Sequence, residues 1–184
     1  MDIHLTSSRL TIRALAPCDL HAFAQYRGMA EVALYQSWSD YSYQDACRLY
    51  QQMSRQPFAT PGHWFQLALV ERETDMLVGD LALFFIDGQQ LEIGVTISPR
   101  YQGRGLAREA VTCLLDYLFG ELKKHRVTAV TDAENQACAR LLKSLGFRLE
   151  AHFVDNIFFK GAWGSEYVFA MLAADWLRLR SGQM

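Results

Sequence analysis

The sequence has no excess of basic residues and no long hydrophobic run. Its 184 residues include 18 Lys and Arg against 20 Asp and Glu, a formal net charge of −2. Proteins that bind nucleic acid or anionic membrane surfaces usually carry a basic excess, so this balance argues against both as general partners. No unbroken apolar run, Leu81 to Ile86 included, approaches the length of a bilayer span, and no stretch has the layout of a signal peptide. We therefore expect a cytoplasmic protein.

Cysteine is too scattered to form a disulfide framework or a zinc site. The four cysteines are far apart in the chain, with no Cys-x-x-Cys pair and no histidine cluster nearby, so reduced thiols and no metal are expected. Repeats, low-complexity tracts and linker-like stretches are also missing. Because 51% of the residues are apolar, the chain can bury a substantial core. We predict a single domain over residues 1–184.

The first part of the chain predicts one strand and two helices. Alternating apolar and polar residues over 10–13 indicate a half-exposed strand, and a proline then begins a helix over 17–27. A second helix over 42–53 is predicted because Ser42 and Asp45 form a capping-box pattern. The aromatic-rich segment between these helices, residues 34–41, is either a loop anchored by its side chains or a wall of a substrate pocket.

The second part predicts an antiparallel meander followed by helices that alternate with strands. The expected elements are strands over 64–71, 77–86 and 91–97, a helix over 104–122, a strand over 127–131, a helix over 134–145 that ends at Gly146, and strands after Phe147 and over 167–172. This order implies a mixed sheet with helices packed on it.

The turn before the helix over 104–122 has the character of a pyrophosphate site. It consists of Gln102, Gly103, Arg104, Gly105, Leu106 and Ala107. Glycine lets the backbone turn tightly and approach a ligand, and the following helix directs its unpaired N–H groups at an anion. The alternative is that the glycines serve the turn alone. The turn lacks the third glycine of the dinucleotide fingerprint and the Gly-Lys-Ser/Thr ending of a nucleoside-triphosphate loop.

Motifs along nearly the whole chain resemble a known family when they are taken together. They are Pro99-Arg100-Tyr101 before the turn, the turn itself, Glu109-Ala110, His125-Arg126-Val127, Asn135 and Leu145-Gly146-Phe147. The combination resembles the Gcn5-related N-acetyltransferase (GNAT) superfamily. The opening Ser8-Arg9-Leu10-Thr11-Ile12-Arg13, the segment with Trp163 and the closing Asp175-Trp176 look like its ribosomal-protein-alanine N-acetyltransferase (Rim-type) branch.

The resemblance implies a fold, a cofactor and its binding residues. The fold would be α+β, with a mixed, mostly antiparallel sheet of six to seven strands and helices on both faces. Acetyl-CoA would lie in a V-shaped gap between the strands over 91–97 and 127–131, with its pyrophosphate on residues 102–107. Val95, Thr96 and Ile97 would pair with the pantetheine arm through their backbone.

Two side chains are expected to contact the cofactor, although each could instead have a purely structural role. Asn135 matches the family asparagine that hydrogen-bonds the cofactor, although it could serve only as a helix-start residue. Arg104 would add a charge-assisted contact to a phosphate, or else remain a solvated arginine at the helix start.

The catalytic candidates are Glu92 and Cys138. Glu92 is the only carboxylate in the strand over 91–97, where family members often carry a glutamate that acts as base through water; the alternative is a solvated outward side chain. The tyrosine that many members use to protonate the thiolate is missing, since Leu142 stands in its place. Cys138, three residues after Asn135, is then the candidate acid, with simple packing as the alternative.

The sequence thus predicts an acetyl-CoA-dependent N-acetyltransferase that acts by direct attack of a primary amine in a ternary complex. The acceptor is a protein N-terminal amine or a small amine, and few acidic residues in the early loops disfavour polyamines and aminoglycosides. Nucleic acid and membrane partners are not expected, and a homodimer is compatible with the family. The competing hypothesis is a non-catalytic acyl-CoA-binding module that keeps the turn without effective proton-transfer groups.

Overall fold

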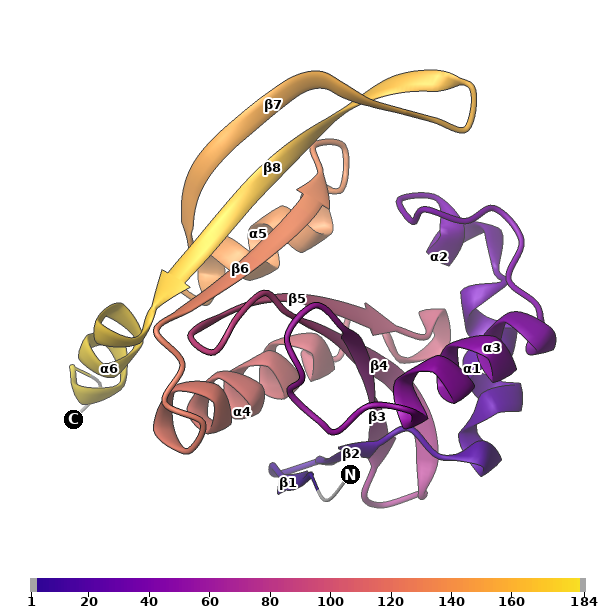
Figure 1. The fold of residues 1–184 in the computed structure, drawn as a ribbon, viewed down its shortest axis with the longest axis horizontal. Helices are drawn as coiled ribbons and strands as arrows, with labels where there is room; N and C mark the ends of the chain where they lie inside the picture. The colour runs from indigo at the N-terminus through magenta and orange to yellow at the C-terminus, as the bar shows by residue number, and fades with distance from the viewer. Residues whose placement is uncertain (1–2, 183–184) are drawn as a thin grey trace.

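A computed structural model describes residues 3–182 as one eight-stranded sheet with helices packed on it (Figure 1). The strand order is β1-β2-β3-β4-β5-β6-β8-β7, and every neighbouring pair is antiparallel except β5 and β6. The strands are β1 His4–Thr6, β2 Leu10–Ala14, β3 Trp64–Glu71, β4 Met76–Phe85, β5 Gln90–Ile97, β6 Arg126–Asp132, β7 Arg148–Phe159 and β8 Ala162–Leu172.

The helices lie on the sheet and at its ends. Helices α1 and α3 pack together and against β3 and β4, whereas α4 packs against β1, β2 and β5. Their bounds are α1 Leu20–Arg27, α2 Ala30–Ala33, α3 Tyr43–Ser54, α4 Leu106–Gly120, α5 Gln136–Ser144 and α6 Ala173–Ser181, with 3-10 turns at Pro17–Asp19 and Pro99–Tyr101. No helix within residues 3–182 is long and apolar enough to cross a membrane.

Local sequence signals set several of these bounds. Ser42 and Asp45 form the capping box at the start of α3, as predicted. Gly146 ends α5 with a φ of 89°, a left-handed conformation that glycine adopts without steric cost. Fully buried apolar residues of β2, β3, β4 and β5 meet those of α4 in one core, which fixes the faces of the sheet.

The prediction of six to seven strands was too low. The structure adds β1, a three-residue strand whose register with β2 is His4 opposite Arg13. Three residues are too few for an alternation to be recognised, and only the pairing with β2 makes them a strand.

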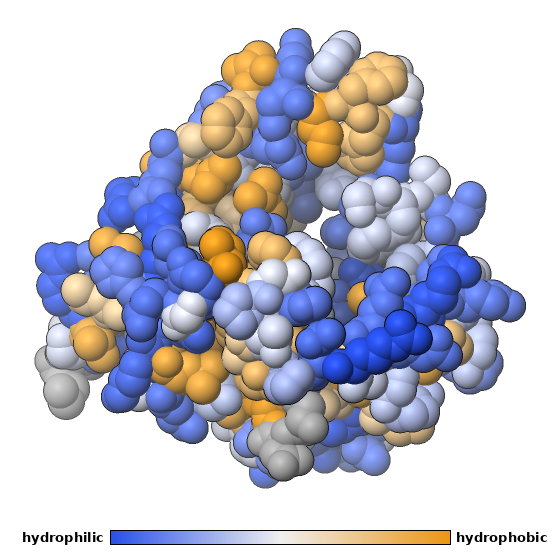
Figure 2. All heavy atoms as spheres, viewed as in Figure 1, coloured by the Kyte–Doolittle hydropathy of each residue, from blue (hydrophilic) through white to orange (hydrophobic). Residues whose placement is uncertain are grey.

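Strands β7 and β8 also form a longer hairpin than expected, with irregular register between Phe153 and Ile157. Figure 2 shows hydrophobic side chains gathered over this projecting hairpin; Phe153, Val154, Ile157, Phe158 and Trp163 are exposed.

Strands β5 and β6 part after a short parallel contact. They pair only from Gln90–Glu92 to Arg126–Thr128, while β5 continues along β4 as far as Ile97. Beyond Glu92, β5 therefore has a strand on one edge only. The exposed backbone groups of that edge must be satisfied by water or by a ligand.

Candidate active site

The opening between β5 and β6 leads into the cavity that is the candidate active site. The cavity has a volume of about 400 Å³ and is bordered by the end of β5, the turn before α4, the start of α5 and the α2 segment. Predicted residues along it are Val95, Thr96, Ile97, Gln102, Gly103, Gly105, Leu106, Ala107, Asn135 and Cys138. The fold thus brings these predicted residues, which span 43 positions from Val95 to Cys138, to one hollow.

The turn presents backbone rather than side chains to this cavity. Gly103 and Gly105 have φ values of 72° and 78°, which non-glycine residues adopt only with strain. Helix α4 starts at Leu106, two residues later than predicted, because Gly105 occupies the position that precedes the helix. The first N–H groups of α4 have no carbonyl of their own helix to bond, and the helix dipole favours an anion there. The geometry suits a diphosphate.

Asn135 lies at the cavity and also caps α5. Its side-chain Oδ1 accepts a hydrogen bond from the backbone N–H of Cys138 at 3.1 Å. The local alternative is therefore realised, since this contact closes the first turn of the helix. Its Nδ2 and the second lone pair of Oδ1 are left for a cofactor, and the cofactor role of Asn135 stays a prediction.

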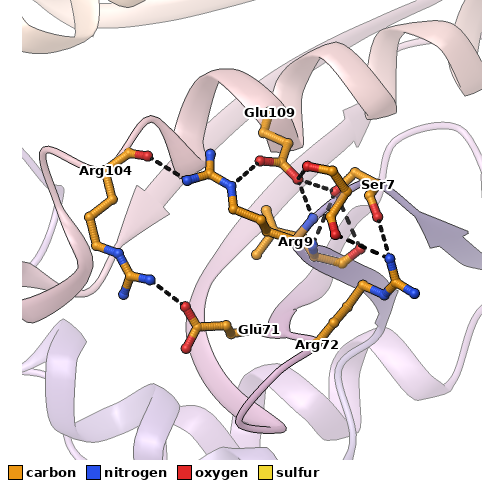
Figure 3. Close-up of polar contacts among 8 residues, drawn as sticks. Ser7, Arg9, Glu71, Arg72, Arg104 and Glu109 are labelled. Carbon is orange, nitrogen blue, oxygen red and sulfur yellow. Dashed lines mark hydrogen bonds and ion pairs between the residues drawn. The ribbon is translucent and has the colours of Figure 1, made fainter.

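The Arg104 side chain points toward β3 rather than into the cavity (Figure 3). Its Nη2 lies 2.6 Å from Oε1 of Glu71, a carboxylate that is largely buried. A hydrogen bond from Thr74, followed by the contact with Arg104, lowers the pKa of Glu71. Arg104 thus holds the turn against β3, and its expected contact to a phosphate is untested.

Glu92 lies where β5 and β6 part and is not among the residues that line the cavity. In the sheet it stands opposite Phe84 of β4 and Thr128 of β6. Burial, and then the negative charge of Glu166 on β8, raise the pKa of Glu92. A half-buried carboxylate with a raised pKa is a suitable proton acceptor near neutral pH.

Cys138 borders the cavity from α5, and its thiol is mostly protonated at neutral pH. Burial raises its pKa, while a side-chain hydrogen bond with Thr131 opposes the rise. Leu142, at the position where the resemblance implies a tyrosine, is 2% exposed and belongs to the core. Of the two positions, only Cys138 therefore places a proton donor at the cavity.

Sequence reasoning missed several residues that line the cavity. Two of them, Glu31 and Val32, come from α2. The others are Tyr101, Arg108, Ala137 and Leu141. Residues 34–41, predicted to be either an anchored loop or a pocket wall, serve as both. Tyr35 and Gln36 line the cavity, whereas Trp38 packs on the guanidinium of Arg27. Arg108 carried a signal, because it follows the turn by one residue on the same helix start.

Comparisons with known proteins agree on one family. Residues 9–148 match the family described as "Acetyltransferase (GNAT) domain". The uncharacterized N-acetyltransferase YnaD of Bacillus subtilis is 29% identical over 175 residues, which cover 95% of this chain and 99% of that protein. A crystal structure of spermidine N-acetyltransferase from Vibrio cholerae, in complex with CoA and spermine, superposes with a TM-score of 0.82 at 25% identity, covering 93% of this chain and 99% of the other.

The ribosomal-protein branch has weaker support. The [Ribosomal protein uS5]-alanine N-acetyltransferase of Escherichia coli is 31% identical over 84 residues, which are 46% of this chain and 43% of that enzyme. Matches to other N-acetyltransferases extend over nearly the whole chain. The comparisons therefore support the superfamily and leave the Rim-type branch as a distant likeness.

Three observations point to the same family. They are the family match over most of the chain, the sheet that opens between two parallel strands, and the glycine turn at the start of a helix. They also favour an enzyme over an acyl-CoA-binding module, because the relatives are named N-acetyltransferases. The chain belongs to the GNAT acetyltransferases and is an acetyl-CoA-dependent N-acetyltransferase.

Proposed function

We propose that this enzyme transfers the acetyl group to the primary amine of a small cationic acceptor by direct attack in a ternary complex. The observation that carries the proposal is the position of Glu92, half-buried at the point where β5 and β6 separate. The cofactor would bind along residues 95–97 and 102–107, with Asn135 beside it, so that the thioester lies near that point.

The reaction needs three proton movements. A primary amine is protonated at neutral pH and must lose a proton before its lone pair can attack the thioester carbonyl carbon. Glu92 accepts that proton through water. After the attack the nitrogen carries one proton more than the amide keeps, and this second proton passes to solvent. When the carbon–sulfur bond breaks, the leaving thiolate takes a proton from the Cys138 thiol, which is then reprotonated from solvent. The products are the acetylated amine and CoA.

The charge around Glu92 favours a cationic acceptor. Glu166 acts on Glu92 as a second negative charge, and it accepts a hydrogen bond from Asn156 at 2.5 Å. Glu92 on β5 and Glu166 on β8, the two strands that flank β6, together attract an ammonium group and stabilise it until it reacts. The likeness to the Vibrio cholerae spermidine N-acetyltransferase supports a small amine, which revises our expectation from the early loops alone. A protein N-terminal amine is the second acceptor class in the tests below.

Replacing Glu92 by glutamine tests the base. The substitution keeps the shape and removes proton acceptance, so kcat should fall by about 10²- to 10⁴-fold while the Kd for acetyl-CoA stays unchanged. In the wild type, kcat/KM should fall as the pH drops through the raised pKa of Glu92, and the variant should lack that acidic limb. Glu150→Gln is the matched control, because Glu150 pairs with Arg126 and Arg148 away from the cavity. Equal turnover of Glu92→Gln and wild type would remove Glu92 from the mechanism.

A further inference from the structure

A guanidinium group from the N-terminal part of the chain contacts the turn from the side opposite the cavity. Arg9, which directly precedes β2, donates from Nη1 to the carbonyl oxygen of Arg104 at 2.9 Å. Its Nε donates to Oε2 of Glu109 on α4 at 2.7 Å. These residues are 95 and 100 positions apart from Arg9 in the sequence, and Figure 3 shows Arg9 between them.

The contact with the Arg104 carbonyl decides which way the next N–H points. In a planar trans peptide the C=O and N–H groups point in opposite directions. A carbonyl of Arg104 that is held toward Arg9 therefore turns the N–H of Gly105 away from Arg9. Gly105 borders the candidate cofactor cavity on one side and, on the other, the shallow groove lined by Arg9 and Glu109.

The glycines by themselves do not fix this orientation. Gly103 and Gly105 both have positive φ, and glycine populates positive and negative φ with similar ease. The peptide between Arg104 and Gly105 can therefore rotate unless another group holds it. A rotated peptide would direct its carbonyl oxygen, a partial negative charge, toward the place where a diphosphate binds.

Arg9 is itself held firmly in position. Oε1 of Glu109 accepts from the Ser7 hydroxyl at 2.7 Å, the Ser8 hydroxyl at 3.1 Å and the Arg9 backbone N–H at 2.7 Å. From the other side, Nη1 of Arg72 donates to the carbonyl oxygens of Ser7 and Ser8 at 3.0 and 3.1 Å. Glu109 and the backbone at Arg9 are thus held in place, and the guanidinium that is anchored to Glu109 through Nε loses less entropy when it also binds the Arg104 carbonyl.

We propose that Arg9 is a positioning residue that keeps the Gly105 N–H directed at the cofactor diphosphate by binding the Arg104 carbonyl from behind. The inference rests on the proposed assignment of the turn to the pyrophosphate. Arg9 does not border the cavity, so it acts on the cofactor only through the peptide that it holds. Glu109 supports it by fixing the Nε end of the guanidinium.

The test separates the part of CoA that carries the diphosphate from the pantetheine arm. Kd is measured for CoA by calorimetry and for pantetheine, which lacks the diphosphate and the phosphorylated adenosine, by NMR titration, with wild type, Arg9→Met and Arg9→Lys. Glu150→Ala is the matched control, since it removes a carboxylate that binds two arginines between β6 and β7. Thermal unfolding of each variant is recorded alongside.

Arg9→Met should raise the Kd for CoA about tenfold, the loss expected for one charge-assisted hydrogen bond, and leave the Kd for pantetheine unchanged. Arg9→Lys, which cannot reach both partners as a fork, should lose nearly as much, and it replaces Arg9→Met if that variant fails to fold. Glu150→Ala should change neither Kd. Equal losses for both ligands, or no loss for CoA, would overturn the role of Arg9. A wild type that binds CoA no more tightly than pantetheine would instead refute the assignment of the turn, and the inference with it.

Discussion

Replacing Asp80 by alanine should lower the free energy of unfolding by about 3–5 kcal/mol, because it leaves a buried arginine without its counter-charge. Asp80 on β4 is 1% exposed, and Arg27 of α1 is 5% exposed. Arg27 Nη1 lies 3.7 Å from Oδ2 of Asp80, and the Tyr26 hydroxyl donates to Oδ1 at 2.5 Å. Within the described residues, Nε of Arg27 has no hydrogen-bond partner, so the cation depends strongly on this one carboxylate.

The two sides of the pair should differ in cost. Burial raises the pKa of Asp80, so a carboxyl left alone in Arg27→Met can take up a proton and become neutral. A guanidinium left alone in Asp80→Ala cannot lose its proton. Methionine also places an apolar, polarisable side chain next to Phe23 and Trp38, whose ring centroids lie 4.6 and 4.3 Å from the guanidinium carbon of Arg27. Arg27→Met should therefore cost less than Asp80→Ala.

The assay is urea unfolding at pH 7, followed by tryptophan fluorescence and far-UV circular dichroism. Tyr26→Phe is the companion variant, because it removes only the hydroxyl and should cost about 1–3 kcal/mol. If Asp80→Ala cost less than 1 kcal/mol, or if Arg27→Met cost as much as Asp80→Ala, the argument from an uncompensated buried charge would be wrong.

Two further predictions follow from the pKa values. The hydrogen bonds that Glu109 accepts lower its pKa from 4.5 to about 2, so Glu109 stabilises the folded state above pH 4.5 and loses that contribution as the pH falls toward 2. The difference in Tm between wild type and Glu109→Gln should therefore be largest above pH 5 and vanish near pH 2. A difference that stays constant with pH would contradict this. Replacing Cys138 by alanine should lower kcat by about tenfold or more if its thiol protonates the leaving thiolate, with little change in Kd for acetyl-CoA, whereas unchanged kcat would leave that proton to solvent.

Much of the fold could be predicted because its signals are local. The capping box of α3 depends on residues three positions apart, the strand Trp64–Glu71 has the predicted bounds, and Gly146 adopts the left-handed conformation expected at a helix end. The short strand β1 was not predicted, because its pairing with β2, rather than a pattern in its own three residues, makes it a strand.

The site was predictable where it is made of backbone. The turn before α4 and the end of β5 could be located because glycine and strand patterns are visible in the chain, and both border the cavity. The Arg104–Glu71 pair and the cavity-lining residues Glu31 and Val32 of α2 were missed because they depend on contacts across the fold; Glu71, for example, lies 33 positions before Arg104. The roles of Glu92 and Cys138 stay predictions.

The most direct test of the proposed function is release of free CoA thiol from acetyl-CoA in the presence of a panel of acceptors, with mass spectrometry of each reaction. The panel contains polyamines, amino acids, aminoglycosides and peptides with different N-termini. The account predicts thiol release and a mass gain of one acetyl group on a small cationic amine, both strongly reduced in Glu92→Gln. Acetylation confined to peptide N-termini would contradict the proposed acceptor, and equal transfer by Glu92→Gln would contradict the proposed base.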